Sequence, residues 1–190
     1  MKVIFTIVSL MFFNTSLIAQ ETEALPYYQL PEYSESYTAG TVAARLVDAL
    51  GFRYYWASAN LNDDDLSFIH QENSRTTGET IDHILDLSYI IVNATLQQAN
   101  SKNDTSLMTF EDKRKQTLYN LQIAADILRV SDDISQFYII SGERKTPFWN
   151  AINGPIADAI WHCGQIASYR RASGNPINPK VNHFMGTVRN

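Results

Sequence analysis

The chain has 190 residues, of which 45% are hydrophobic and 18% are charged, and its formal net charge is −5. This length suits one domain of ordinary size, and the composition excludes a disordered chain. Acidic and basic residues are mixed along the sequence, which excludes the basic stripe that a nucleic-acid-binding protein uses to neutralise phosphates. The single cysteine, Cys163, excludes an intramolecular disulfide.

The first 20 residues have the order of features found in a secretory signal peptide. Lys2 supplies a positive charge, an uncharged and mostly apolar run covers Val3–Phe13, and the small residue Ala19 precedes Gln20. The apolar run is shorter than the roughly 20 residues that a membrane span needs. We therefore predict a signal peptide over residues 1–19, a mature chain that begins at Gln20 and is secreted or periplasmic, and no stable membrane insertion.

An extended lead-in and a first amphipathic helix follow. Residues 20–39 are rich in Pro, Tyr, Glu and Ser and show no helical period, so we expect extended chain whose tyrosines pack on the body of the domain. Apolar side chains recur at helical spacing across residues 40–58, which predicts a helix. Its apolar stripe consists of Val42, Leu46, Leu50 and Tyr54. The run NLNDDD, residues 60–65, has turn chemistry and ends the helix.

Two more helices are predicted in the middle of the chain. Thr76 and Glu79 have the spacing of a capping box, which predicts the start of a helix that continues to about Ala99. After a polar connection, a third helix is predicted over Phe110–Val130 from the spacing of its leucines. Residues 131–153 show no period of useful length, so we expect irregular chain without strands.

The last helix is predicted to begin at Pro155, because a proline lacks the N–H that would be unpaired at a first helical position. It runs to about Ala172, and the sequence GNP at residues 174–176 stops it. Residues 177–190 are expected to form a polar tail. Four amphipathic segments with modest connections predict an all-α fold, and specifically a four-helix bundle over residues 40–176.

One set of residues in these helices could hold a metal ion. Bundles bind metals with side chains from different helices, often with a pair one turn apart on one of them. Asp158 and His162 have that spacing, and Gln165 and Tyr169 continue their stripe as candidates to orient a substrate. His83, in the second helix, would complete two imidazoles and a carboxylate, which leaves positions open for water or substrate. The spacing alone also fits an ordinary helical pair and a hydrogen-bonded core histidine.

The remaining reactive side chains have simpler explanations. His70 lies in a predicted loop and His183 in the tail, and both are expected to be ordinary surface residues. Cys163 lies among aromatic and aliphatic residues and is expected to be a small buried hydrophobe. Arg170 and Arg171 fall in the last turn of the predicted helix, where a cation favours the helix dipole.

Two stretches of the sequence resemble the DinB-like (DinB/YfiT) family. Residues 75–84, RTTGETIDHI, are similar to the start of that family's second helix, where a small-residue cap and an acidic residue precede a metal-ligating histidine. Residues 161–166, WHCGQI, with YRR at 169–171 and GNP at 174–176, are similar to its last helix, in which a histidine stands just before x-Gly-Gln. The likeness implies a four-helix bundle of the DinB/YfiT-like type.

The resemblance also implies a ligand set. His83 matches the family's second-helix ligand, and His162 matches the second histidine of its His-x-x-x-His pair. Asp158 stands where the family has the first histidine of that pair, which is a departure. Because a carboxylate oxygen is harder than an imidazole nitrogen, the metal preference is expected to move from nickel or zinc toward iron or manganese. The departure is also compatible with a site that has lost its metal.

The resemblance implies a function as well. Characterised members of the family use the metal to activate a low-molecular-weight thiol for transfer or isomerisation. We therefore expect a metal-dependent transferase or hydrolase that acts on a small molecule, with a divalent metal ion (zinc, nickel, iron or manganese) as cofactor. The alternative is a non-catalytic exported module with a structural or vestigial metal site. An iron oxygenase is a third hypothesis based only on ligand types, and formation of a homodimer stays open.

Overall fold

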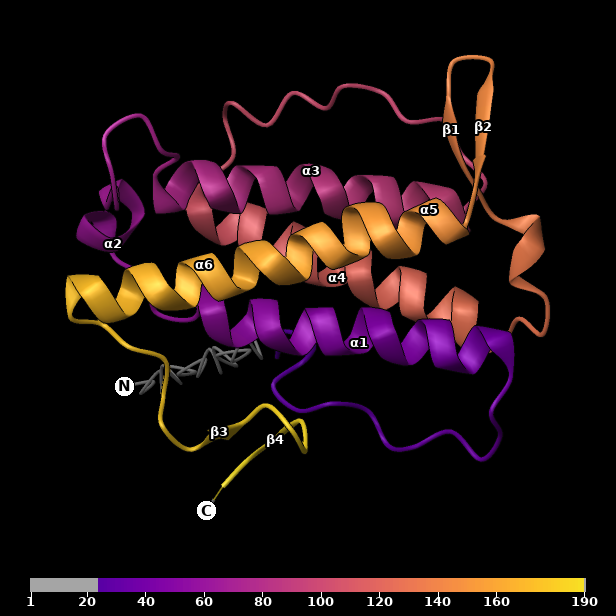
Figure 1. The fold of residues 1–190 in the computed structure, drawn as a ribbon, viewed down its shortest axis with the longest axis horizontal. Helices are drawn as coiled ribbons and strands as arrows, with labels where there is room; N and C mark the ends of the chain where they lie inside the picture. Colours follow the sequence, from indigo (N-terminus) through magenta and orange to yellow (C-terminus); the bar gives the residue numbers. More distant parts are fainter. Residues whose placement is uncertain (1–23, 190) are drawn as a thin grey trace, which may run out of the picture.

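In the described part of the chain, residues 24–189 of a computed structural model, four long helices form the body of the molecule (Figure 1). They are α1 (Ala39–Ser58), α3 (Thr77–Thr95), α4 (Phe110–Arg129) and α6 (Ala157–Ser173). The helices lie side by side, with α1 and α3 each packed against both α4 and α6. The predicted all-α class is confirmed in that the fold is mostly helical. The predicted signal peptide lies outside the described residues.

The starts of α1, α3 and α4 are fixed by threonines that close capping boxes. The three N-cap residues are Thr38, Thr76 and Thr109. The box predicted from the sequence is confirmed, since Glu79 N–H donates to Thr76 Oγ1 at 3.0 Å and Thr76 N–H donates to Glu79 Oε2 at 2.8 Å. All three helices therefore begin within about one residue of the predicted positions, because capping satisfies N–H groups that have no partner inside the helix.

The predicted end of α3 is wrong by one turn. The helix stops at Thr95, not near Ala99, because Gln97 adopts a left-handed conformation with φ of +56°. Beyond it, Ala99 pairs with Ile140 in an isolated β-bridge, and Asn100 N–H donates to Ile140 O at 2.8 Å. The helix therefore ends where the chain pairs with a later segment. The sequence around Gln97 shows no local pattern that predicts this pairing.

The core lies between the four helices and is built from leucine and isoleucine with a few aromatic rings. Of the stripe predicted on α1, Leu50 and Tyr54 are fully buried, and Leu46 is partly buried against the core. Val42 is 57% exposed although its neighbours Ala43 and Ala44 are buried, so Val42 lies on the outer face of α1. No helix between residues 24 and 189 combines the length and the apolar character that crossing a bilayer requires.

The lead-in packs on the body only in its first part. Tyr27 is buried, and the ring of Tyr28 lies 5.2 Å from the ring of Trp56. Tyr33 and Tyr37 are 72% and 96% exposed, so the expectation that the tyrosines pack on the body is wrong for these two.

Short elements fill segments that were predicted to be irregular. Residues 60–65, expected to be a turn, contain the start of the five-residue helix α2 (Asp63–Ser67), which Asn62 caps. After the 3₁₀ turn η1 (Ile134–Gln136), a hairpin joins β1 (Tyr138–Ser141) to β2 (Arg144–Pro147). The tail contains a smaller pair, β3 (Val181–Asn182) and β4 (Thr187–Val188). The prediction of no strands is therefore wrong, because strands of two to four residues are too short to show a period.

The last helix follows a short helical segment from which a kink separates it. Helix α5 (Trp149–Ala151) passes into a π-helical turn, η2 (Ile152–Ile156), which leads directly into α6. Gly154 inside this run has non-helical angles (φ −94°, ψ −107°), so two helical segments meet there at a kink. Pro155 is the first residue after the kink, which agrees with the helix start predicted from the sequence. A wide π turn forms different hydrogen bonds from an α turn, and such turns occur mostly as single insertions within α-helices. The predicted stop is confirmed, because Gly174 ends α6 in a left-handed conformation with φ of +92°.

Candidate metal centre

The structure brings together the three side chains that the sequence selected as metal ligands. His83 projects from α3, and Asp158 and His162 project from the neighbouring helix α6. One ligand atom from each of the three residues lies within 4.8 Å of the other two. The i,i+4 spacing places Asp158 and His162 on one face of α6, and packing of α6 on α3 places His83 opposite them.

The carboxylate of Asp158 lies between the two imidazole rings. Its Oδ2 atom is 3.1 Å from Nε2 of His83, and its Oδ1 atom is 3.4 Å from Nε2 of His162. The two rings meet edge to face, with centroids 4.7 Å apart and planes at 87°. Between residues 24 and 189, no lysine or arginine forms an ion pair with this carboxylate. The negative charge of Asp158 thus has two imidazoles as its partners and no permanent cation.

Gln165 contacts one ring nitrogen of His162, and the other ring nitrogen faces Asp158. The ring atom Nδ1 of His162 lies 2.6 Å from Oε1 of Gln165, one turn further along α6. Since an amide oxygen accepts, Nδ1–H of His162 is the donor in this contact, and a neutral ring with that proton has its lone pair on Nε2. In this neutral form, Nε2 and Oδ1 of Asp158 would be two acceptors 3.4 Å apart, which a shared cation would bridge. A ligating histidine whose other ring nitrogen is hydrogen-bonded is the usual arrangement in metal sites.

The cluster is open to solvent on the side of Asp158. The side chains of His162, His83 and Asp158 are 12%, 28% and 41% exposed, respectively. Asp158 also lines a pocket of about 600 Å³. The other lining residues are Leu87, Asn153, Gly154, Pro155, Ala157 and Trp161. Because most of these are apolar, the pocket combines an apolar wall with one carboxylate of the cluster.

The π-helical turn sits immediately before this site. Asp158 is the second residue of α6, and η2 ends two residues earlier at Ile156. Gly154 inside the turn has non-helical angles (φ −94°, ψ −107°), and Ile156 is fully buried. The kink at Gly154 and the burial of Ile156 together fix where α6 begins, one residue before Asp158. Turns of this kind occur often at functional sites.

The other histidines lie outside the cluster. His70 is exposed and stacks on Tyr169, with ring centroids 5.8 Å apart. Tyr169 therefore contacts the chain before α3 and not the three clustered side chains. His183 lies at the edge of the Phe52 ring, and burial together with the charge of Arg53 lowers its pKa. Both histidines are exposed residues, as the sequence predicted.

Cys163 and Arg170 have structural roles. Cys163 is buried, and burial raises the pKa of its thiol to about 12, so the thiol is protonated at neutral pH. This confirms the interpretation of Cys163 as a small buried hydrophobe. Arg170 is 3% exposed and donates to the carbonyl oxygens of Trp56 and Ala57 at 2.9 and 3.1 Å. The helix-dipole explanation for Arg170 is incomplete, because its guanidinium caps the end of α1.

Comparisons with protein-family models, with curated proteins and with solved structures found no match to this chain. The resemblance to the DinB-like family stays a prediction based on the residues quoted for it. Two features of the site were missed from the sequence. The role of Gln165 as the partner of His162 had a local signal, the i,i+3 spacing, whereas the pocket beside Asp158 had none, since the π turn that shapes it leaves no periodic pattern.

Proposed function

We propose that this chain is a four-helix-bundle protein of the DinB/YfiT-like type that binds one divalent metal ion through His83, Asp158 and His162. The observation that carries the proposal is the convergence of three donor groups from two helices, with Gln165 Oε1 2.6 Å from Nδ1 of His162. An isolated pair of surface residues would not need such support. The match to the family's ligand pattern at His83 and His162 adds to it.

The donor set fits a divalent ion. For metal–nitrogen and metal–oxygen bonds of about 2.0–2.2 Å, neighbouring donors around one ion are roughly 3.0–3.5 Å apart. The separations from Asp158 to His83 and to His162, 3.1 and 3.4 Å, fall in this range but start from different oxygens of the carboxylate. One ligand atom from each residue lies within 4.8 Å of the other two, so binding a single ion would draw the three groups closer together. Two imidazoles and one carboxylate suit zinc, nickel, iron and manganese, and the oxygen ligand favours the harder ions relative to a set of three histidines. Three protein ligands leave at least one position for a small molecule.

We propose a metal-dependent transferase or hydrolase activity on a small molecule. When bound, a divalent ion supplies the Lewis acidity that makes water or a thiol nucleophilic near neutral pH. The residues of the chain contribute the rest: His83 and His162 hold the ion, Gln165 orients His162, and Asp158 joins the ligand set to the pocket. Trp161 and Leu87 give this pocket an apolar wall on which the substrate body would rest.

Metal analysis of protein purified without an affinity tag tests the binding proposal. We expect about one equivalent of a divalent metal in the wild type and its loss in His83→Ala and in His162→Ala, because no neighbouring side chain replaces either donor. His70→Ala and His183→Ala are matched controls that keep the metal. A site emptied by the control substitutions but not by His83→Ala would overturn the ligand assignment.

The departure at Asp158 gives a second test. Asp158→His restores three imidazoles at the same helical spacing, so we expect zinc or nickel binding to strengthen relative to manganese. Competition titrations of both proteins with each metal measure the change. Unchanged metal preference would show that Asp158 does not ligate.

Turnover separates the enzyme from a non-catalytic module. The metal-loaded protein is incubated with small esters and with thiol acceptors, and Trp161→Ala serves as the pocket variant. Product formation that requires the metal and decreases in Trp161→Ala supports the catalytic proposal. One equivalent of tightly bound metal without any turnover would instead support a non-catalytic metal-binding module.

We also propose that the chain is exported, on the order of charge, apolar run and small residue in its first 20 residues. The intact mass of the protein recovered from the periplasm or the medium tests this. We expect a mature chain that begins at Gln20. A product that keeps residues 1–19 and sediments with membranes would contradict the proposal.

A further inference from the structure

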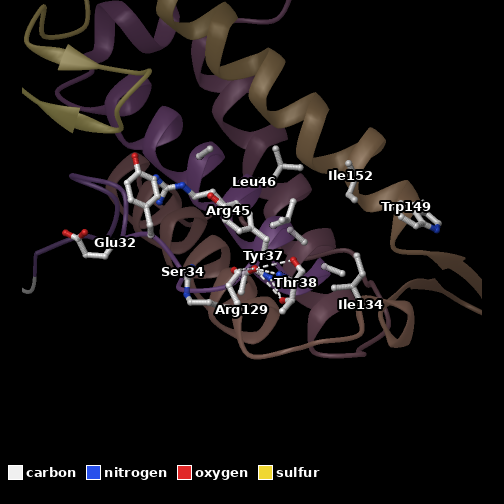
Figure 2. Close-up of a pocket in the computed structure, with 17 residues that line it drawn as sticks. Glu32, Ser34, Tyr37, Thr38, Arg45, Leu46, Arg129, Ile134, Trp149 and Ile152 are labelled. Atoms are coloured by element: carbon white, nitrogen blue, oxygen red, sulfur yellow. Dashed lines mark hydrogen bonds between the residues drawn. The ribbon is translucent and has the colours of Figure 1, made fainter.

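A second and larger pocket, of about 830 Å³, lies at the beginning of α1 (Figure 2). Its walls come from the lead-in, the first half of α1, the last residue of α4, η1 and the helical segment before α6. It shares no lining residue with the pocket beside Asp158. We call it the α1 groove, and the residues that matter for its chemistry are Arg45, Val42, Leu46, Tyr37, Trp149 and Ile152.

The α1 groove is mainly apolar and leaves large side chains uncovered. Val42, Trp149 and Tyr37 are 57%, 70% and 96% exposed. Figure 2 shows Leu46, Ile152 and Trp149 along one side of the groove. A pocket of several hundred Å³ with mostly apolar walls and a few polar groups has the character of a small-molecule site.

Arg45 supplies a positive charge within this apolar surface. One Nη atom of Arg45 donates to the carbonyl oxygen of Pro31 at 2.7 Å, and the guanidinium lies over the ring of Tyr33, 4.9 Å from its centroid. These contacts fix the orientation of the guanidinium. Within residues 24–189 it forms no ion pair with a carboxylate, although Glu32 also lines the groove.

The other arginine of the groove differs in this respect. Arg129 donates to both carboxylate oxygens of Asp48, at 3.0 and 3.2 Å, and to Asp126 at 3.4 Å. Its charge is therefore already neutralised within the protein. Arg45 is the groove arginine that remains available, and a fixed guanidinium binds a carboxylate or sulfonate through charge-assisted hydrogen bonds.

We propose that the α1 groove binds a small organic anion with an apolar or aromatic body. The anionic group pairs with Arg45, and the body covers Val42, Leu46, Ile152 and Trp149. The ligand belongs to the class of medium-chain fatty acids and aromatic acids. The inference rests on the groove alone and does not depend on metal binding at Asp158.

A pair of fluorescent probes separates the two parts of this proposal. 1-Anilinonaphthalene-8-sulfonate carries an anionic group, and N-phenyl-1-naphthylamine has the same aromatic body without it. We expect the folded protein to bind one equivalent of the sulfonate. Loss of a charge-assisted hydrogen bond in Arg45→Gln should weaken sulfonate binding by about tenfold or more and leave the neutral probe unaffected. Trp149→Ala should weaken both probes.

Two further variants serve as controls. Arg45→Lys keeps the charge and should retain most of the sulfonate binding, whereas Arg144→Gln removes an exposed arginine of the hairpin and should change nothing. Thermal melts of each variant establish that it is folded. Sulfonate binding that is unchanged by Arg45→Gln, an equal loss of both probes in that variant, or no response of either probe to Trp149→Ala would overturn the proposal.

Discussion

Two aspartates show how differently this molecule treats a negative charge. Asp48, on α1, has a side chain that is 1% exposed and accepts two hydrogen bonds from Arg129 of α4. Asp158, on α6, has a side chain that is 41% exposed and contacts two imidazoles. The first charge is buried and neutralised by a cation of the same chain. The second is half open and is surrounded by groups that bind either a proton or a metal.

The difference follows from the cost of burying charge. A buried carboxylate destabilises the fold unless a partner in good geometry compensates it, which Arg129 does with a bidentate contact. A half-exposed carboxylate is solvated by water and needs no such partner. Asp48 and Arg129 thus hold α1 and α4 together, whereas Asp158 is left available for an external cation.

The largest effect should come from breaking the buried pair. Arg129→Ala leaves Asp48 buried without a counter-ion, so we expect the free energy of unfolding to fall by about 3–5 kcal/mol. Urea denaturation followed by circular dichroism measures it. Arg144→Ala, which removes an exposed arginine, is the control. A loss below about 1 kcal/mol in Arg129→Ala would show that water reaches Asp48 freely.

The second largest effect on stability should come from metal binding, and it should depend on the cluster that contains Asp158. An ion that binds the folded state at about 100 times its dissociation constant stabilises it by about 2.7 kcal/mol, which raises Tm by roughly 5–10 °C for a chain of this size. Differential scanning fluorimetry after chelation and metal addition checks this. His162→Ala should abolish the response, while His183→Ala should keep it. A wild-type Tm that no divalent metal moves would argue for an empty site.

Removing the hydrogen bond between Gln165 and His162 should have a smaller effect, and this effect should be on metal affinity. Gln165→Leu removes the acceptor from Nδ1 of His162, so we expect metal affinity to fall about 10–100-fold. Gln165→Glu keeps an acceptor at this position and should retain most of the affinity. Competition with a chromogenic chelator measures both. If Gln165→Leu binds metal as tightly as the exposed-site control Ser168→Ala, the hydrogen bond to His162 has no part in binding.

The smallest effect on stability should come from neutralising Asp158 in the metal-free protein. Because this carboxylate is half exposed and has no lysine or arginine partner, Asp158→Asn should change the unfolding free energy of the metal-free protein by no more than about 0.5 kcal/mol. The same substitution should remove most of the stabilisation that metal provides. A large loss of unfolding free energy in the metal-free protein would show that Asp158, like Asp48, stabilises the fold.

Local chemistry accounts for what could be predicted from the sequence. The helices were found because apolar side chains recur with a period that burial requires, and their starts because Thr76 and Glu79 satisfy unpaired N–H groups. Asp158 and His162 could be paired because i,i+4 spacing fixes their common face. His83 could be proposed as the third ligand from its place on another helix, and the family resemblance supported this choice, but no local pattern predicts its contact with Asp158 because the two residues are 75 positions apart.

The errors fall where distant contacts override local pattern. Asp48 and Arg129 are 81 positions apart, and neither residue signals the other. Val42 has the spacing of a core residue but lies on the outer face of α1, where it lines the α1 groove, while Ala43 and Ala44 beside it are buried. The end of α3 and the hairpin strands depend on a bridge between Ala99 and Ile140. Such features arise only once the helices are packed.

The π-helical turn Ile152–Ile156 constrains how the length of this chain could vary in evolution. Gly154 kinks the chain inside this turn, and the buried Ile156 holds the start of α6 in the core. Deleting one of the five residues would therefore displace the start of α6, and with it Asp158 and His162, relative to the core. Their carboxylate and imidazole would then leave the face that packs on His83. Insertions and deletions should therefore be tolerated in the exposed connection between α3 and α4 but be absent from these five residues in any relative that keeps the cluster.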